Sequence, residues 1–234
     1  VSVTGEQIVR HAPVLLPVEA LDRCHVSTWT NAGAGQLFHS PVQGSGIEER
    51  AVSLIEGEDT FHGTPDDLFF GHARLAPVGA AGPEVITLAR KNARMRITVR
   101  GLDRRIPEDR YYLTVEIPND GYDFVGNPIA GTARVRRTGA FHDNGDFSTD
   151  EAFNLIHTDP AVSPAGGVTV NLYEKALGRS ADRLIASVTD DDGRPISLPT
   201  GRTVNLLIDL NEGGGLSVYT EITPWDEIYQ WDIW

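Results

Sequence analysis

Hydrophobic and polar residues alternate along many short segments of this chain of 234 residues. In the segment 94–100, Met95, Ile97 and Val99 alternate with charged or polar residues, and the same period of two recurs at 111–117. Because successive side chains of a strand point to opposite faces, this period predicts strands with one buried face. Further strands are predicted at 2–9, 25–30, 51–55, 85–88, 168–172, 184–189, 204–210 and 216–222.

Turn residues separate these segments. Asp120-Gly121 is a dipeptide that favours a tight turn, so we expect a hairpin turn at 118–121 with 122–125 as the return strand. The glycine-rich run 211–215 predicts a second hairpin, between the last two strands. The Asp-rich runs 143–146 and 190–193 are interpreted as turns stabilised by Asp side chains, with a weak calcium site at either as the alternative.

Helices are expected only as short pieces, at 66–70 and at 150–156 with Thr149 as the N-cap. Many short strands, punctuated by 24 Gly and 14 Pro, are typical of antiparallel, Ig-like β-sandwiches. We therefore predict an all-β fold of two tandem sandwiches. A polar stretch at 139–150 suggests a boundary that divides the chain into residues 1–143 and 144–234.

Composition excludes several classes of protein. The chain has 20 basic and 33 acidic residues, a net charge of −13, which argues against binding to nucleic acid or to an anionic membrane surface. A chain of this length can bury a core without a disulfide or a metal, and the single Cys24 excludes a disulfide scaffold. The start lacks an initiating Met and a signal peptide, so we expect a processed or trimmed N-terminus.

No catalytic motif is found. The chain has no phosphate-binding loop and no nucleophile elbow, and Gly33-Ala34-Gly35 lacks the third glycine of the dinucleotide fingerprint. The seven histidines have no zinc spacing; His62 and His72 flank a predicted helical turn and could meet, but isolated histidines are the favoured interpretation. Adjacent carboxylates such as Asp66-Asp67 are interpreted as solvated surface. We predict no enzyme activity, no cofactor and no metal site.

The C-terminal residues 223–234 are unusually aromatic, because they contain three of the four tryptophans: Trp225, Trp231 and Trp234. One interpretation is that these rings pack on the end of a sandwich. The other is an aromatic surface or strand edge that meets a partner chain or a sugar. Pro224 cannot donate to a ladder, which places it at a bend or an edge.

Several segments, taken in order, resemble the Bacteroides-type, FimB-like family of fimbrial anchor lipoproteins. They are the strand around Trp29-x-Asn31, the aromatic-Gly segment 67–72, the strand pair 85–99 and the end at 222–225. The resemblance implies two transthyretin-like sandwiches, export, a lipidated N-terminal cysteine in the outer membrane, and a place at the base of a fimbria. The chain departs from the family at its start, where no cysteine precedes Val1 and the first strand of the N-terminal sandwich is expected to be short or absent.

The leading hypothesis is a non-enzymatic structural subunit on the bacterial surface. It would anchor a pilus to the outer membrane, through a lipid not carried by these residues, and join fimbrillin by β-strand addition. The expected interface is either the depleted N-terminal sandwich or the C-terminal strand with its tail: Leu216, Val218, Thr220, Ile222, Trp225, Trp231 and Trp234.

Two alternatives come from other functional classes. One is a secreted carbohydrate-binding or adhesin module that presents Trp225, Trp231 and Trp234 to sugars. The other is a β-sandwich hydrolase that uses Asp and His residues at loop ends.

Overall fold

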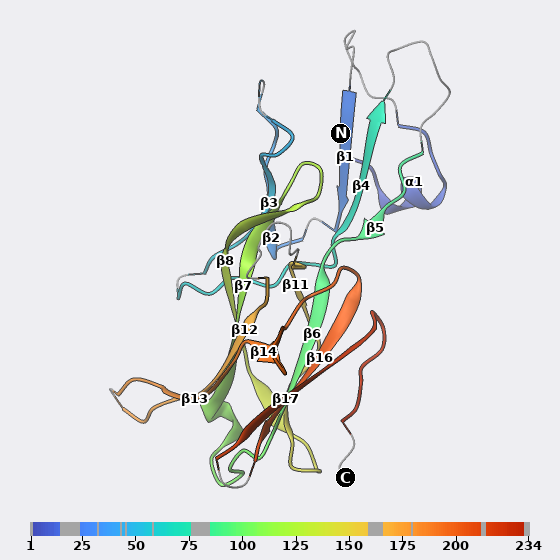
Figure 1. The fold of residues 1–234 in the computed structure, drawn as a ribbon. Coiled ribbons are helices and arrows are strands. Elements are labelled where there is room, and N and C mark those ends of the chain that lie inside the picture. The colour runs from blue at the N-terminus through green and yellow to red at the C-terminus, as the bar shows by residue number, and fades with distance from the viewer. Residues whose placement is uncertain are drawn as a thin grey trace.

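The computed structural model describes residues 2–14, 24–31, 33–42, 44, 46–57, 59–75, 85–158, 166–178, 180–211 and 214–231. Strands make up nearly all regular structure in these residues, which confirms the predicted all-β fold (Figure 1). The exceptions are a short helix, α1 (Gly5–Val9), and one turn of 3-10 helix, η1 (Glu108–Arg110). Within the described part of the chain, no helix is long and apolar enough to cross a membrane.

One six-stranded sheet has the order β17-β16-β6-β10-β9, and β11 pairs with β6 beside β10. β16 runs parallel to β6, whereas the other pairs are antiparallel. Its strands are β6 (Ala93–Arg100), β9 (Gly139–Phe141), β10 (Phe147–Thr149), β11 (Phe153–Leu155), β16 (Arg202–Leu210) and β17 (Leu216–Pro224).

The second six-stranded sheet has the order β13-β12-β7-β3-β2, and β8 pairs with the opposite side of β7. The first half of β7 pairs with β12 and its last residues pair with β3, so this one strand links the two ends of the molecule. The strands are β2 (Gln36–Phe38), β3 (Arg50–Leu54), β7 (Tyr111–Asp123), β8 (Pro128–Arg137), β12 (Thr169–Glu174) and β13 (Arg183–Val188).

Two smaller sheets complete the described structure. A three-stranded sheet has the order β1-β4-β5 and lies at the upper end in Figure 1. A two-stranded hairpin, β14-β15, lies beside β17. The strands are β1 (Cys24–Thr30), β4 (Phe69–Leu75), β5 (Ala89–Arg90), β14 (Asp190–Asp191) and β15 (Arg194–Pro195).

The main core lies between the two six-stranded sheets. Met95, Ile97 and Val99 of β6 are fully buried, as their alternation predicts, and they belong to the same apolar cluster as Leu113 and Val115 of β7. Burying each such side chain stabilises the fold by about 1.5–3 kcal/mol. The alternation places these apolar side chains on the facing sides of the two sheets, and their packing holds the two layers together.

The core continues to the upper end through aromatic side chains. Trp29 of β1 contacts Phe70 of the neighbouring β4, and across the layers it contacts Phe38 of β2 and Tyr122 of β7, with ring centroids 4.5–6.3 Å apart. The three-stranded sheet therefore packs against the end of the second six-stranded sheet.

The hairpin turn predicted at 118–121 is wrong. β7 continues to Asp123, and the chain reverses at 124–127 before β8 begins. A Cβ at Gly121 would lie 2.1 Å from the carbonyl oxygen of Val52, so this glycine allows two strands to approach closely. Pairing with β3 decided the conformation of a dipeptide that, by itself, favours a turn.

The two predicted helices are also wrong. Residues 150–156 contain β11, whose Phe153 pairs with Met95, and residues 66–70 lead into β4. Phe153 and Leu155 are buried on either side of the more exposed Asn154, which is the period of a strand. Partners distant in sequence override a weak local preference for helix.

The predicted return strand 122–125 is instead the end of β7 and part of the turn that follows it. Two further predicted strands are wrong, whereas the others match strands of the structure within a few residues. Residues 2–9 contain α1, because Thr4 and Gln7 form a capping box in which each side chain accepts the other's backbone N–H. Residues 85–88 have no regular structure, and β5 follows them. The predicted hairpin of the last two strands is confirmed as β16-β17.

The division at residue 143 stays a prediction. Strands on both sides of that residue share the two six-stranded sheets, since β6 pairs with β10, β11 and β16, and β7 pairs with β12. The polar stretch 139–150 forms β9, a turn and β10.

Candidate functional site

β17 is an edge strand, and among the described strands it forms a ladder only with β16. The N–H of Thr220 donates to Asp191, outside this ladder. Because backbone groups of an antiparallel strand point alternately toward and away from its partner, the outward groups belong to Leu216, Val218, Thr220 and Ile222. The structure thus brings the four predicted strand residues into one row along the sheet edge.

The side chains of this row differ in exposure. Leu216 and Ile222, near the two ends, are 45% and 49% exposed, whereas Val218 packs against the core. An edge strand with free backbone groups and exposed apolar side chains is a template for pairing with another chain. The ends of β17 meet both conditions.

Asp191 of β14 covers the middle of this edge. One of its carboxylate oxygens accepts the backbone N–H of Thr220 at 3.1 Å and the Thr220 hydroxyl at 2.5 Å. Arg194 lies 3.7 Å from the same oxygen. A carboxylate has no N–H with which to extend a ladder, so Asp191 interrupts pairing at the centre of β17.

Trp225 follows β17 directly and is only 9% exposed. The guanidinium groups of Arg90 and Arg94 lie 4.1 and 5.1 Å from the centre of its indole ring. Its carbonyl oxygen accepts hydrogen bonds from Arg94 at 2.9 Å and from the Thr203 hydroxyl at 2.8 Å. The packing interpretation is therefore right for this tryptophan, which is not available as a binding face.

The tail, residues 225–231, is also held by Asn205 on β16. The buried side chain of Asn205 accepts the N–H of Tyr229 at 3.2 Å and donates to Thr223 at 3.1 Å. Thr223 in turn donates to the carbonyl oxygen of Glu227 at 2.6 Å. These bonds satisfy polar groups that would otherwise be costly to bury, and they tie the tail to β16.

An aromatic cluster forms where the tail meets β17. The ring of Trp231 lies edge-on to Tyr229 with centroids 4.9 Å apart, and 6.4 Å from the ring of Tyr219. Tyr219 and Tyr229 are 49% and 41% exposed, and Trp231 is half-buried. Of the two predicted tryptophans that the structure describes, Trp231 is in an accessible cluster and Trp225 is buried, while Trp234 lies outside the described residues.

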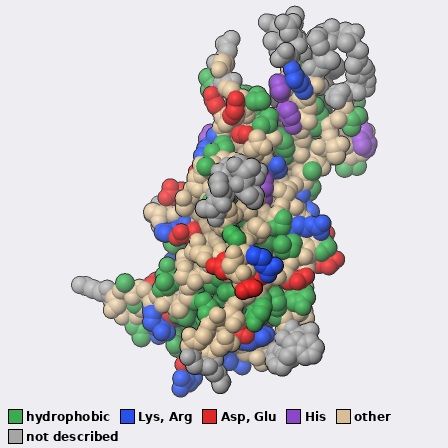
Figure 2. All heavy atoms as spheres, in the orientation of Figure 1, with side chains coloured by type: hydrophobic (Ala, Val, Ile, Leu, Met, Phe, Trp, Pro, Cys, Tyr) green, Lys and Arg blue, Asp and Glu red, His purple; other side chains and the backbone are tan. Residues whose placement is uncertain are grey.

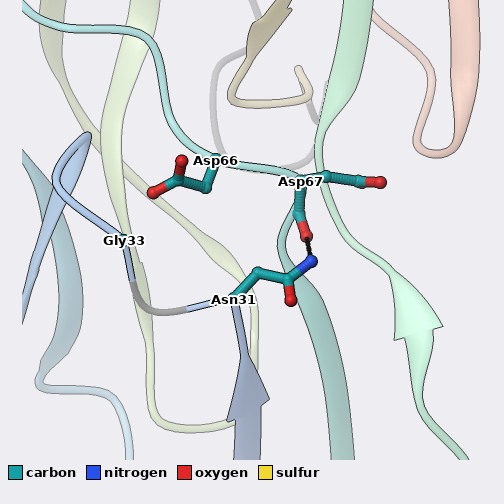
Figure 3. Close-up of a pocket in the computed structure, with 4 residues that line it drawn as sticks. All are labelled: Asn31, Gly33, Asp66 and Asp67. Atoms are coloured by element: carbon teal, nitrogen blue, oxygen red, sulfur yellow. Dashed lines mark hydrogen bonds between the residues drawn. The ribbon is translucent and has the colours of Figure 1, made fainter. Parts of the chain in front are cut away.

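A separate shallow pocket of about 400 Å³ is lined by Asn31, Gly33, Asp66 and Asp67. Figure 3 shows the two carboxylates pointing in opposite directions, so they do not form an acid–base pair. Asp66 accepts from Gln36 at 2.9 Å.

The sequence predicted that Asp67 is a solvated surface carboxylate. In the structure it forms an ion pair with Arg90 through two hydrogen bonds, of 2.6 and 2.8 Å. The hydrogen bond to Asp67 raises the pKa of Arg90 above its usual value, although burial acts in the opposite direction. This ion pair orients the guanidinium group of Arg90, which lies over the ring of Trp225. Arg90 therefore connects Asp67, in the wall of the pocket, with the tail.

His62 and His72 have different partners, and the favoured interpretation of isolated histidines is wrong for His72. His62 binds the backbone of Arg134 on β8, and His72 contacts His25. Within the described ranges, no group of three or more His, Cys, Asp or Glu side chains is arranged to hold a metal ion.

Sequence reasoning missed Asp191, Tyr219 and Tyr229. A signal for Tyr219 was present, because it alternates with the apolar row of 216–222 and therefore lies on the opposite face of that strand. Tyr229 stands between two tryptophans in the tail. Asp191 carries no such signal, since its run was interpreted as a turn and its contact with Thr220 is made in space.

No curated protein matches the sequence significantly. The fold is similar to that of the fimbrial anchor protein Mfa2 from Porphyromonas gingivalis, with 12% identity, a TM-score of 0.58, and coverage of 87% of this chain and 75% of that one.

Two structures from Bacteroides thetaiotaomicron are similar to the same degree. A candidate adhesin has 13% identity and a TM-score of 0.60, over 95% of this chain and 82% of that one. A candidate polysaccharide-binding protein has 14% identity and a TM-score of 0.59, over 90% of this chain and 78% of that one. At such identities these likenesses establish the fold alone.

The family itself is established by the sequence. The model of the family described as "Fimbrillin-A associated anchor proteins Mfa1 and Mfa2" matches residues 2–231, nearly the whole chain. The resemblance noted in the sequence is thereby confirmed, and the chain belongs to the family of fimbrillin-A associated anchor proteins.

Proposed function

We propose that this chain is a non-enzymatic structural subunit of a bacterial surface fimbria, which binds a fimbrillin by β-strand addition. The observation that carries the proposal is the edge of β17, where outward backbone groups and two exposed apolar side chains, Leu216 and Ile222, stand in one row. Family membership supports the fimbrial context.

Strand addition at this edge has a simple chemistry. An extended fimbrillin segment would form main-chain hydrogen bonds with the outward groups of Leu216, Val218 and Ile222, and its alternate side chains would pack beside the apolar ones. A continuous ladder also needs the N–H of Thr220, so the Asp191 side chain must rotate away on binding. In the free protein, the same carboxylate prevents premature pairing.

The three-stranded sheet at the other end of the molecule is the second candidate for the acceptor. β1 is its edge strand among the described strands, and Cys24–Thr30 has half-buried side chains at every position except His25. A strand added beside β1 would complete their burial. The two acceptors can be separated by variants that affect only one of them.

We propose that the fimbria is attached to the outer membrane through an N-terminal lipid carried outside these residues. Cys24 is not the attachment point, because it lies in β1 and pairs with Leu75 of β4. This part of the proposal is supported by the family and by the position of Cys24.

The test mixes the purified chain with a purified fimbrillin and follows complex formation by size-exclusion chromatography. We expect a one-to-one complex that resists detergent until it is heated, because a whole ladder must break at once. Ile222→Pro removes an outward N–H without touching the bonds to β16 and should weaken the complex, whereas Ile222→Thr keeps that N–H and should largely retain it. A wild-type chain that stays monomeric beside every fimbrillin would refute the proposal.

The aromatic cluster favours a second function, carbohydrate binding. Tyr219, Tyr229 and Trp231 present rings on the surface, and aromatic faces pack well against the apolar faces of sugars. Screening on a glycan array tests this function. Trp231→Ala should abolish any binding, whereas Leu184→Ala, at an exposed apolar residue of β13, is the matched control. Binding that survives Trp231→Ala would exclude the cluster as the sugar site.

A further inference from the structure

His25 and His72 form a pair on the neighbouring strands β1 and β4. Their ring nitrogens, Nδ1 of His25 and Nε2 of His72, lie 3.1 Å apart, and the rings are 5.3 Å apart between centroids with an angle of 21° between planes. Both side chains are exposed. Figure 2 shows histidine side chains gathered on the upper part of the molecule, where β1 and β4 run.

The register explains why the two rings meet. His25 is directly opposite Arg74, and His72 is directly opposite Ser27, so the two histidines are diagonal neighbours on one face of the sheet. Side chains in this relation are within reach of each other when they are long or aromatic. β1 and β4 are paired along seven consecutive residues, which fixes the spacing of the two Cα atoms.

We propose that His25 and His72 chelate a divalent transition-metal ion of the zinc, nickel and copper class. Metal–nitrogen bonds in proteins are about 2.0–2.1 Å long. Two nitrogens separated by 3.1 Å would then subtend about 100° at a shared ion, between the right angle of square-planar or octahedral sites and the tetrahedral angle. The spacing already matches a two-nitrogen chelate.

Only the tautomer and the ring orientation must change for an ion to enter. In the free protein one of the two facing nitrogens carries the proton and the other accepts it, so neither nitrogen offers a free lone pair to an ion. A change of tautomer moves that proton to the remote nitrogen, and rotation about χ2, a soft torsion for His, turns both lone pairs toward one point. The backbone stays in place, which makes the site largely preorganised.

One neighbour steadies the pair. The ring of Phe70 is stacked on His72 with planes 8° apart, and Phe70 is itself packed on Trp29 of the core. Metal-binding strength depends on such outer contacts, because they orient the ligands. Phe70 therefore positions His72 without contacting the ion.

The remaining neighbours define which ion fits. Cys24 precedes His25 in the strand and so points to the opposite face, which leaves no thiolate in the site. Arg74 adds positive charge beside His25 and weakens the attraction of any cation. With two imidazoles and water as ligands, the site suits the ions that prefer nitrogen and not Ca²⁺ or Mg²⁺, which prefer oxygen.

The test titrates the purified chain separately with Cu²⁺, Ni²⁺ and Zn²⁺ in a calorimeter, with Mg²⁺ as the control ion. We expect one ion per chain for the first three, strongest for Cu²⁺, and no heat from Mg²⁺. Since loss of an outer contact already weakens metal sites about 10- to 100-fold, His25→Gln and His72→Gln should each weaken binding at least tenfold.

Two control variants and one spectrum locate the bound ion. His11→Asn removes an exposed histidine near α1, and Cys24→Ser removes the nearby thiol; both should bind as the wild type does. In an NMR spectrum, substoichiometric Cu²⁺ should broaden the ring signals of His25 and His72 before those of the other histidines. Binding that is unchanged in both Gln variants, or lost in either control variant, would overturn the proposal. The site is independent of the fimbrial function, because it requires no partner.

Discussion

β8 and β17 both lie at a sheet edge, but they are covered in different ways. The edge of β8 is covered by the chain segment 62–64: His62 donates its backbone N–H to the carbonyl oxygen of Arg134 at 2.6 Å and accepts the N–H of Arg134 through its ring at 3.2 Å. Farther along β8, Arg137 binds the hydroxyl of Thr64 at 2.9 Å. Among the residues that the structure describes, only the carboxylate of Asp191 hydrogen-bonds to the outward backbone of β17.

This contrast indicates which edge is suited to receive a partner. A covering loop must be unfolded locally before another strand can pair, whereas a side chain needs only a change of rotamer. The edge of β8 is therefore closed in the native state, and the edge of β17 is protected but accessible. Variants at the two edges and in the tail test the contrast.

The tail supports β17 from its end, and β8 has no equivalent support among the described residues. Trp225→Ala should lower the free energy of unfolding by about 3 kcal/mol, because it empties a buried space between Arg90 and Arg94 and loses both cation contacts. Trp231→Ala, at a half-buried position, should cost about 1 kcal/mol. Urea unfolding measures both. An equal loss of unfolding free energy in the two variants would mean that Trp225 is not the main contact through which the tail stabilises β17.

The open ends of β17 should be needed for partner binding. Ile222→Pro should weaken fimbrillin binding about tenfold or more, because it removes one ladder hydrogen bond and places a ring against the incoming strand. Surface plasmon resonance measures the change in Kd, with Ile222→Thr as the matched control. If the two variants bind equally well, the ladder does not form at β17 and β1 becomes the favoured acceptor.

Removing the side chain that protects each edge should promote self-association at β17 but not at β8. Asp191→Ala should cost about 1–2 kcal/mol of stability through its lost hydrogen bonds and should promote self-association through the freed N–H of Thr220. Asp191→Asn keeps an acceptor at that position and should stay monomeric. Sedimentation velocity measures association, and urea unfolding measures the cost.

His62→Ala is the corresponding change at β8. It should cost about 1 kcal/mol, because it removes one acceptor while the backbone bond to Arg134 remains. This variant should not associate. Association of His62→Ala to the same extent as Asp191→Ala would remove the contrast between the two edges.

The last prediction concerns the effect of pH on stability. Burial, followed by the hydrogen bond to Asp182 at 2.7 Å, raises the pKa of Tyr112 to about 12. An unfolded tyrosine titrates near pH 10, so between about pH 10 and 12 the folded chain keeps a proton that the unfolded chain loses. This contribution is therefore complete below pH 10 and is lost as the pH rises through that window.

Thermal unfolding across the alkaline range tests this prediction. Tyr112→Phe should reduce the decline of stability between pH 10 and 12 relative to the wild type, because the variant has no proton to lose there. Tyr229→Phe, at an exposed tyrosine of the tail, is the control and should leave the decline unchanged. An identical decline in Tyr112→Phe would show that other groups cause it.

The sequence predicted most strands correctly because alternation is a local signal. Met95, Ile97 and Val99 reveal the buried face of β6 from residues only two apart. The errors arose where the local signal was ambiguous. Asp120-Gly121 is a good turn sequence, and only its pairing with β3 extends it into β7. The segment 150–156 has a plausible helix cap, yet its partner is β6.

The candidate site was predicted in part for the same reason. The row from Leu216 to Ile222 follows from alternation, and the concentration of tryptophans in the tail is visible in composition. Whether each tryptophan is a core residue or a surface residue depends on neighbours such as Arg90 and Arg94, which precede Trp225 by more than a hundred residues. Composition therefore found the tail but could not assign Trp225 and Trp231 to different roles.

The amino-acid sequence was enough to define the all-β class, the buried faces of most strands, the last hairpin and the family. Which edges are covered, and which histidines meet, became visible only in the folded chain. Asp191 reaches Thr220 across 29 residues, His25 reaches His72 across 47, and His62 reaches Arg134 across 72. The period of a strand is set by adjacent residues, whereas these contacts depend on the order of strands in the sheets, which no short stretch of sequence encodes.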